Sequence, residues 1–191
     1  MSAAQRGLLL LAEFEKPDID EAAIVQLIQG GASLRQKDGM DNTALALACY
    51  YGMEAVALLL IEEGAAVNAR NAEGRTPLME AAHAELVTVV HRLLAKGAQV
   101  NRKDEYDNSA LSEACNRSNR GLALLLLSAG AAPVACPGLP DLAPVMAIHN
   151  KQERRSVANG MLYAAAAAAG GSRRQQSRRQ KRKQRKTRKQ K

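Results

Sequence analysis

Cysteine and histidine are the side chains best suited to chemistry in this sequence, and neither is arranged for it. The chain has three of each: Cys49, Cys115, Cys136, His83, His91 and His149. The cysteines form no C-x-x-C motif and no cluster with the histidines, so their spacing predicts neither a zinc site nor a disulfide framework. No nucleophile motif or glycine-rich phosphate loop is present. We therefore expect no enzymatic activity, no metal and no cofactor.

The tyrosines are the other distinctive residues, because the chain is poor in aromatic side chains. It has four tyrosines, one phenylalanine and no tryptophan, yet Tyr50 and Tyr51 are adjacent in the stretch "ACYYG". Tyrosine supplies a large contact area at a low cost in rotamer entropy and is common among interface hot spots. The pair is therefore a candidate partner contact. The alternative is that either ring packs against a neighbouring part of the fold.

Composition and charge divide the chain into a body and a tail. A length of 191 residues with 47% apolar content fits one domain with an aliphatic core plus an appendage. Of the 27 basic residues, 12 lie in residues 173–191, which contain no acid. The other 15 share residues 1–172 with all 19 acidic residues, so that part has a net charge of −4. The prediction is a mildly acidic body with a strongly basic tail.

Neither long apolar stretch is expected to enter a membrane. Residues 121–140 are uncharged, but serine, glycine and three prolines interrupt them, so we interpret them as a buried helix and a loop. The apolar run in the N-terminal "RGLLLLAEFE" is too short for the hydrophobic region of a secretory signal peptide. Together with the few, widely spaced cysteines, this indicates a soluble intracellular protein in a reducing compartment.

A 33-residue repeat organises the body. The segment "GAAVN" at Gly64 recurs as "GAQVN" at Gly97, and the same interval links Thr43, Thr76 and Ser109, which open "TALALAC", "TPLMEAA" and "SALSEAC". The period predicts three blocks: residues 38–70, 71–103 and 104–136. Self-similarity at such a period is typical of stacked repeats.

Each block has the pattern of a turn followed by two antiparallel helices. Thr43, Thr76 and Ser109 are suited to cap a first helix, and Pro77 follows at a position where a missing N–H does no harm. Aliphatic second helices end at glycines that favour a left-handed cap: Gly64, Gly97 and Gly130. Asn68 and Asn101 follow valine in a turn and are expected to hydrogen-bond the turn backbone. Two short helices cannot bury both faces, so the units must stack into a solenoid.

These blocks resemble the ankyrin repeat, most closely in "GRTPLMEAAHAELVTVVHRLLAKGAQVN" at residues 74–101. The resemblance implies an all-α solenoid of helix-turn-helix units with short β-turn fingers. Residues 1–37 are similar to a degenerate N-terminal capping repeat in which only the second helix matches, and residues 137–163 to a divergent C-terminal cap. An Ala/Gly linker at 164–172 and a disordered basic tail at 173–191 follow.

Two departures from the ankyrin pattern affect the turns and the contacts between repeats. The histidine that follows the leucine in the family is replaced by Ala46, Met79 and Ser112. We therefore do not expect the usual histidine network between repeats. The turn glycine survives only as Gly74, while Asp41 and Asp107 occupy the equivalent positions. Since aspartate tolerates the left-handed conformation better than most residues, we expect these turns to persist.

The resemblance also implies a function and a surface. Ankyrin-like chains bind partner proteins through a concave face made by the turns and by the ends of the first helices, so we expect a monomeric, non-enzymatic interaction module, an adaptor or scaffold. The matching positions here are Met40, Asn42, Tyr50, Tyr51, Glu73, Arg75, His83, Glu105, Tyr106, Asn108, Asn116 and Arg117.

The basic tail has several possible roles. Its densest cluster comprises Arg178, Arg179, Lys181, Arg182, Lys183, Arg185 and Lys186. Such a cluster is typical of a nuclear import signal and is compatible with loose binding to nucleic acid, so a nuclear location is favoured over a cytoplasmic one. A nucleic-acid-associated protein that binds mainly through this tail is the alternative function. A merely solubilising charge run is also possible, whereas a membrane partner is not expected because no apolar anchor accompanies the charges.

Overall fold

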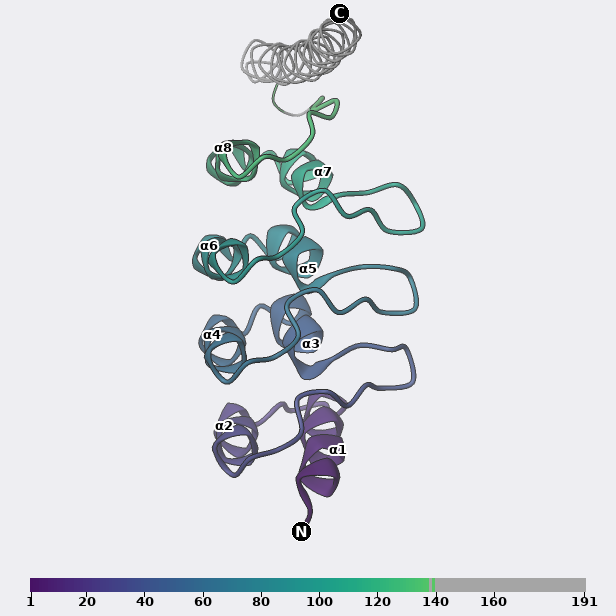
Figure 1. Ribbon diagram of the computed structural model, residues 1–191, viewed down its shortest axis with the longest axis vertical. Helices are drawn as coiled ribbons and strands as arrows, with labels where there is room; N and C mark the ends of the chain where they lie inside the picture. The colour runs from purple at the N-terminus through teal and green to yellow at the C-terminus, as the bar shows by residue number, and fades with distance from the viewer. Residues whose placement is uncertain (138, 140–191) are drawn as a thin grey trace, which may run out of the picture. The chain divides into compact units, whose positions relative to one another are not determined.

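The structure, a computed structural model, describes residues 1–137 and residue 139. These residues form eight α-helices: α1 (Ala3–Phe14), α2 (Glu21–Gln29), α3 (Ala44–Tyr50), α4 (Glu54–Glu62), α5 (Pro77–His83), α6 (Val87–Ala95), α7 (Ala110–Asn116) and α8 (Arg120–Ser128). Consecutive helices pack in pairs, and the odd-numbered and even-numbered helices form two separate rows (Figure 1). The described part is therefore the all-α stack of helix-turn-helix units that the repeat predicted.

The first helix of each repeat begins where the sequence predicted. Thr43, Thr76 and Ser109 each accept a hydrogen bond from the backbone N–H three residues later, and Pro77 occupies the first turn of α5. The glycines that follow the second helices have positive φ angles of 82° at Gly64 and 84° at Gly97. Local capping chemistry thus sets both ends of each unit.

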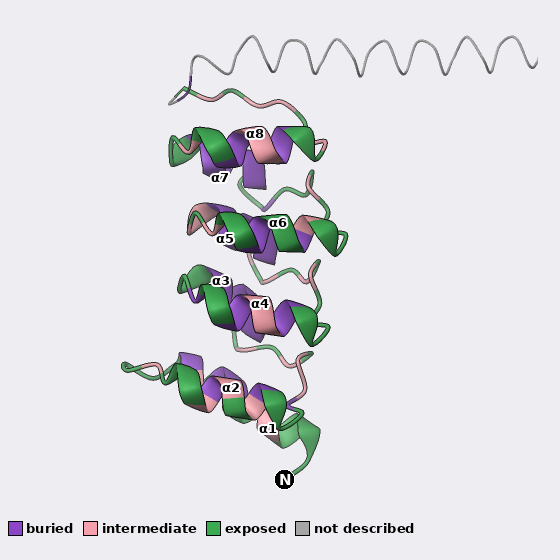
Figure 2. Ribbon diagram, turned by 90° about the vertical axis from the view of Figure 1, so that its left-hand side faces the viewer, coloured by how far each residue is buried: buried purple, intermediate pink, exposed green. Residues whose placement is uncertain are grey.

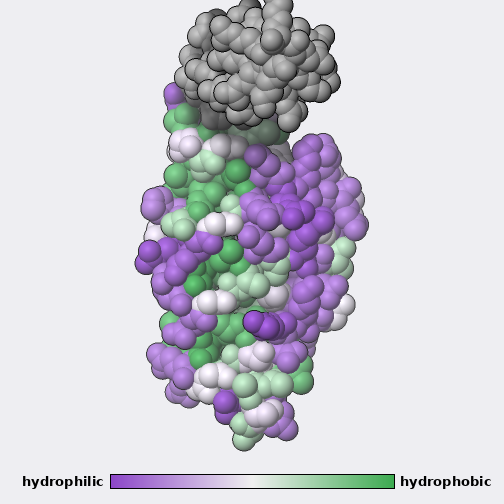
Figure 3. All heavy atoms as spheres, in the orientation of Figure 1, coloured by the Kyte–Doolittle hydropathy of each residue, from purple (hydrophilic) through white to green (hydrophobic). Residues whose placement is uncertain are grey.

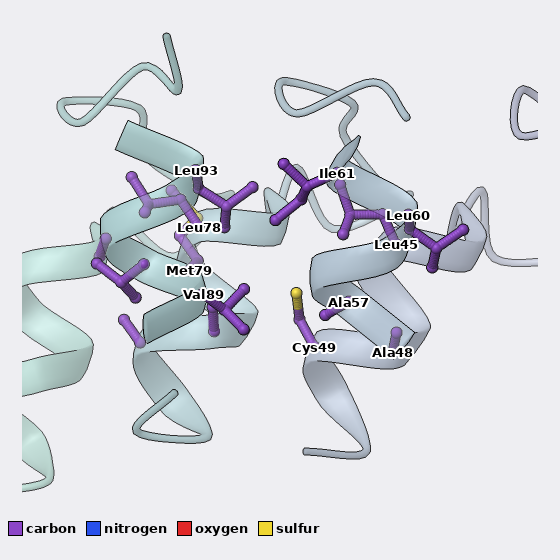
Figure 4. Packing of buried hydrophobic residues seen from close by; sticks show 14 of the residues in the cluster. Leu45, Ala48, Cys49, Ala57, Leu60, Ile61, Leu78, Met79, Val89 and Leu93 are labelled. Atoms are coloured by element: carbon purple, nitrogen blue, oxygen red, sulfur yellow. The ribbon is translucent and has the colours of Figure 1, made fainter. Parts of the chain in front are cut away.

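The core repeats with the same period as the sequence. Leu45, Leu78 and Leu111 lie 33 residues apart and are all buried, as are Leu60, Leu93 and Leu126 on the second helices. Figure 4 shows Leu45, Leu60, Leu78 and Leu93 packed between neighbouring helices, with Cys49 nearby. Figure 2 shows that the even-numbered helices alternate buried and exposed residues, as helices with one solvent face do. Contacts within each helix pair and between neighbouring repeats therefore both contribute to the core.

The turns keep their shape without a conserved glycine. Asp41 and Asp107 have φ angles of 63° and 65°, close to the 76° of Gly74 at the equivalent position. This confirms the expectation that aspartate supports the left-handed turn. A second set of equivalent positions, in the turn between the two helices of a repeat, holds Gly52 at 72° and Ser118 at 54°.

Asparagine side chains join consecutive repeats. The Asn68 amide donates to the Gly97 carbonyl at 3.1 Å and accepts from the Gln99 N–H at 2.8 Å. Asn101 makes the equivalent pair of bonds one repeat later, to Gly130 and Ala132. The predicted hydrogen bonds to the turn backbone are confirmed, and they connect one repeat to the next in a chain that lacks the family's histidine.

The N-terminal region contains a full helix pair, where sequence matching identified only the second helix. Helix α1 begins at a capping box in which Ser2 accepts from the Gln5 N–H and the Gln5 side chain accepts from the Ser2 N–H. Leu10, Leu11 and Phe14 of α1 are buried in the common core. The predicted C-terminal cap, linker and basic tail lie outside the described residues, apart from residues 137 and 139.

The cysteines require a correction. Cys115, at the end of α7, and Cys136, which follows α8, are joined by a disulfide with their Cα atoms 5.0 Å apart. The spacing of the cysteines predicted no disulfide, because it does not reveal that the chain after α8 returns to α7. Cys49 is free and fully buried, as expected of a small core residue.

Candidate partner-binding surface

Three loops, here called fingers 1, 2 and 3, precede α3, α5 and α7 and project from the row of odd-numbered helices (Figure 1). They comprise residues 37–43, 70–76 and 103–109. In finger 1, Oδ1 of Asp38 accepts the N–H of Met40 at 2.9 Å and of Asn42 at 2.8 Å. Asn71 and Asp104 accept the equivalent N–H groups in fingers 2 and 3. Each finger is therefore closed by its own side chain.

Backbone hydrogen bonds join one finger to the next. The Ala72 N–H donates to the Met40 carbonyl at 2.9 Å, and the Glu105 N–H donates to the Glu73 carbonyl at 3.0 Å. A basic side chain adds to the link between fingers 1 and 2, because Nζ of Lys37 donates to the Arg70 carbonyl at 3.1 Å. The three tips thus form one continuous edge, on the side of Figure 3 where hydrophilic residues predominate.

Large side chains stand exposed at the tips of fingers 1 and 3. Met40 is 56% exposed and Tyr106 is 72% exposed. The two predicted asparagines instead turn inward: Nδ2 of Asn42 donates to Asp38 at 2.9 Å and Nδ2 of Asn108 donates to Asp104 at 3.2 Å. Asn42 and Asn108 therefore shape the fingers, whereas Met40 and Tyr106 remain available for contacts.

The tyrosine pair is exposed at the end of α3. Tyr50 is 59% exposed and Tyr51 is 48% exposed, and their rings meet edge to face with centroids 5.2 Å apart. Tyr51 also stacks on the buried ring of Phe14, at 6.2 Å between centroids and 12° between planes. The ring of Tyr51 therefore packs against the N-terminal unit, as the alternative interpretation predicted, while both tyrosines remain exposed.

Arg75 is not free, although its position predicted a partner contact. Its Nε and Nη2 atoms donate to the two carboxylate oxygens of Glu80 at 2.7 and 3.1 Å. Its Nη1 donates to Glu113 at 2.8 Å and to Asp104 at 3.4 Å. The Arg75 side chain is only 15% exposed. Hydrogen bonding to Glu80, helped by Glu113, raises the pKa of Arg75 above its ordinary value against the opposing effect of burial.

His83 extends this charge network to the surface. Its Nδ1 lies 3.1 Å from a Glu113 oxygen, and its Nε2 contacts the Arg117 guanidinium. Because a guanidinium only donates, Nε2 must accept, so we assign the proton to Nδ1 and its hydrogen bond to Glu113. His83 therefore bridges Arg117 and the interior network, which ties the second repeat to the third.

The structure separates the predicted residues into two groups. Exposed ones form what we call the candidate face: Met40, Tyr50, Tyr51, Glu105, Tyr106, Asn116 and Arg117. Half-buried ones are held in the fingers or the network: Asn42, Glu73, Arg75, His83 and Asn108. The sequence did not predict the roles of three residues: Phe14, Glu80 and Glu113. The two glutamates recur 33 residues apart inside first helices, and this recurrence was the sequence signal that could have identified the charge network. The predicted tail residues 178–186 lie outside the described residues.

Two other kinds of site were searched for along the described chain. No helix there is long and apolar enough to cross a membrane. Among the same residues, no group of three or more histidine, cysteine, aspartate or glutamate side chains could hold a metal ion.

Comparison with known proteins identifies the repeat. A family model described as ankyrin repeats (3 copies) matches residues 8–104, just over half of the chain. The match begins within α1, so it includes the helix that the period did not reveal, and it ends at the start of finger 3. No curated protein matches the sequence. Helices α7 and α8 continue the same capping and core pattern beyond the match. The chain belongs to the ankyrin-repeat family, whose repeats are generally protein–protein interaction modules.

Proposed function

We propose that the chain is a non-enzymatic, monomeric adaptor or scaffold that captures another protein on the candidate face. The observation that carries the proposal is the exposure of the aromatic side chains. Tyr50, Tyr51 and Tyr106 are all among the exposed large hydrophobic residues, whereas Phe14 is the one aromatic residue in the described core. Exposed tyrosines at the ends of first helices and at a finger tip are suited to interface hot spots.

The rigidity of the fingers supports the same proposal. Each finger is closed by side-chain hydrogen bonds, and adjacent fingers are joined through backbone bonds. A surface that is already ordered loses little conformational entropy when a partner binds. Met40 and Tyr106 are therefore presented on a preorganised edge. Asn42, Asn108 and Arg75 act indirectly in this proposal, by holding the edge in place.

The test is affinity capture with the full chain, followed by identification of the bound protein. Replacing Tyr50 and Tyr51 together by alanine should weaken capture by at least about tenfold. Val87→Ala is the matched control, because Val87 is exposed on a second helix outside the candidate face. Equal capture by the tyrosine variant and the wild type would refute the assignment.

Thermal stability distinguishes a binding role from a packing role. Loss of the contact between Tyr51 and Phe14 should cost only about 0.5–1.5 kcal/mol, as for other aromatic pairs, so the double variant should melt within a few degrees of the wild type. A much larger fall in the midpoint would assign the pair to the core instead. Tyr50→Ala alone should be closer to neutral, since Tyr50 contacts only the edge of Tyr51 among the described aromatic rings.

For the basic tail we propose nuclear targeting, with loose binding to polyanions as a second effect. The support is compositional: 12 basic and no acidic residues in residues 173–191. Deleting residues 173–191 should move a fluorescently tagged chain from the nucleus to the cytoplasm while partner capture persists. If capture disappears with the tail or with nuclease treatment, the alternative of a nucleic-acid-associated protein is favoured.

A further inference from the structure

The turns that follow α1 and α3 combine exposed aromatic rings with carboxylates. Tyr50 and Tyr51 stand at the end of α3, and the ring of Phe14, the last residue of α1, stacks on Tyr51. The contact between Phe14 and Tyr51 brings the two turns together. Tyr50 is 59% exposed and Tyr51 is 48% exposed, so part of each side chain remains accessible to a ligand.

Three exposed carboxylates flank these rings. Glu15 directly follows Phe14, Asp18 lies in the same turn, and Glu54 follows Tyr51 by three residues, so its Cα is within about 11 Å of the Tyr51 Cα. Within the described residues none of these three carboxylates takes part in an ion pair. We call the set Glu15, Asp18, Tyr50, Tyr51 and Glu54 the turn patch.

The charge around the turn patch is not compensated locally. Residues 13–21 contain five acidic side chains and one basic side chain, Lys16, whose Nζ lies 2.7 Å from Glu13. The turn between α7 and α8 instead carries an exposed basic side chain, Arg117, directly after α7. A cationic partner segment is therefore attracted to the N-terminal end of this series of turns and repelled from the C-terminal end.

We infer that the turn patch binds an arginine-rich segment of a partner protein. A guanidinium stacks on the face of a tyrosine ring and can donate two parallel hydrogen bonds to a carboxylate at the same time. The turn patch offers both kinds of acceptor on two turns that the contact between Phe14 and Tyr51 joins. A lysine ammonium would meet the carboxylates as a point charge but would lack the planar stacking. Arginine should therefore be preferred over lysine. This inference rests on the proposed function and specifies the chemistry of the partner.

The test measures binding of the full chain to two labelled synthetic peptides by fluorescence anisotropy. One alternates arginine with glycine, and the other has lysine in place of arginine. The arginine peptide should bind about fivefold more tightly. Replacing Tyr50 and Tyr51 by alanine should abolish that preference. Replacing Glu15, Asp18 and Glu54 by their amides should weaken both peptides by about tenfold and reduce the dependence on salt.

Tyr106→Ala is the matched control, because it removes an exposed tyrosine from finger 3 and leaves the turn patch intact. The basic tail is present in every variant, so its non-specific repulsion of the cationic peptides is the same in all measurements. The inference would be overturned if the two peptides bound with equal affinity or did not bind. It would also be overturned if Tyr106→Ala weakened binding of the arginine peptide as much as the replacement of Tyr50 and Tyr51 does. The proposed function would stand in each case if protein capture still depended on Met40 or Tyr106, so the two failures are distinguishable.

Discussion

Replacing Arg75 by alanine should be among the most destabilising single changes in the protein. Arg75 is the shared partner of three carboxylates, from Glu80, Asp104 and Glu113, whose side chains are at most 9% exposed. Removing it would leave buried negative charge without its counterion. Breaking a buried ion pair in this way typically costs about 3–5 kcal/mol. That is a large part of the roughly 5–15 kcal/mol by which native domains are stable.

The loss should be unequal among the three acids. Glu80 has no other hydrogen-bond partner among the described residues, so it would lose both of its bonds. Glu113 would keep His83, and Asp104 would keep the N–H groups of finger 3. Hydrogen bonds to charged groups contribute about 1.5–3 kcal/mol each, so the Glu80 pair alone accounts for most of the expected loss.

Urea denaturation followed by circular dichroism measures the effect. With a slope of about 1–3 kcal/mol per molar urea, the transition midpoint should fall by one molar or more. A loss below about 1 kcal/mol at neutral pH would refute the reasoning, since it would place the network among weak surface pairs.

The first repeat provides a matched control for this prediction. At the positions of Arg75 and Glu80 it carries Asn42 and Leu47, 33 residues earlier. The double variant Arg75→Asn with Glu80→Leu should therefore be more stable than Arg75→Asn alone, because it removes the carboxylate that would otherwise be left unpaired. If the two variants were equally unstable, packing of the Arg75 side chain would be the cause of the loss.

Three further predictions concern single positions. Ser118→Gly should stabilise the protein by about 1 kcal/mol in urea denaturation, because Ser118 has a φ of 54° that glycine adopts without strain. Asn101→Ala should destabilise it by about 1–3 kcal/mol, since the Gly130 carbonyl and the Ala132 N–H lose their partner. Burial raises the pKa of the Cys49 thiol, so a thiol-reactive dye should label it only when the protein unfolds. The free energy of unfolding should also fall as the pH rises above about 9.0, because the thiol then ionises in the unfolded chain but not in the folded one. The Cys49→Ala variant should lack this contribution to the pH dependence.

The repeat could be predicted from sequence because its signals are local. Thr43, Thr76 and Ser109 act on backbone groups three residues away, and the buried leucines recur at the same interval. Helix α1 lacks that signature because it has no finger before it. Its capping box at Ser2 and Gln5 was nevertheless readable in the sequence.

The roles of Arg75 and Cys136 could not be predicted, because both depend on contacts between residues far apart in the chain. Arg75 lies at a finger position that varies between repeats, and only the positions of Glu80 and Glu113 on neighbouring helices show that it turns inward. Cys136 meets Cys115 across 21 residues through the path of the chain after α8. Neither the inward position of Arg75 nor the pairing of Cys136 with Cys115 can be read from the spacing of residues along the chain.

The inward position of Arg75 separates stability from recognition. A guanidinium has five N–H donors, and the hydrogen bonds to Glu80, Asp104 and Glu113 use Nε, Nη1 and Nη2. A partner that recruited Arg75 would have to leave Glu80 unpaired, which would cost more than one new surface contact returns. Under the proposed function, the binding energy comes instead from Tyr50, Tyr51, Met40 and Tyr106, whose removal should cost the fold little. Substitutions in these two groups should thus affect affinity and stability separately.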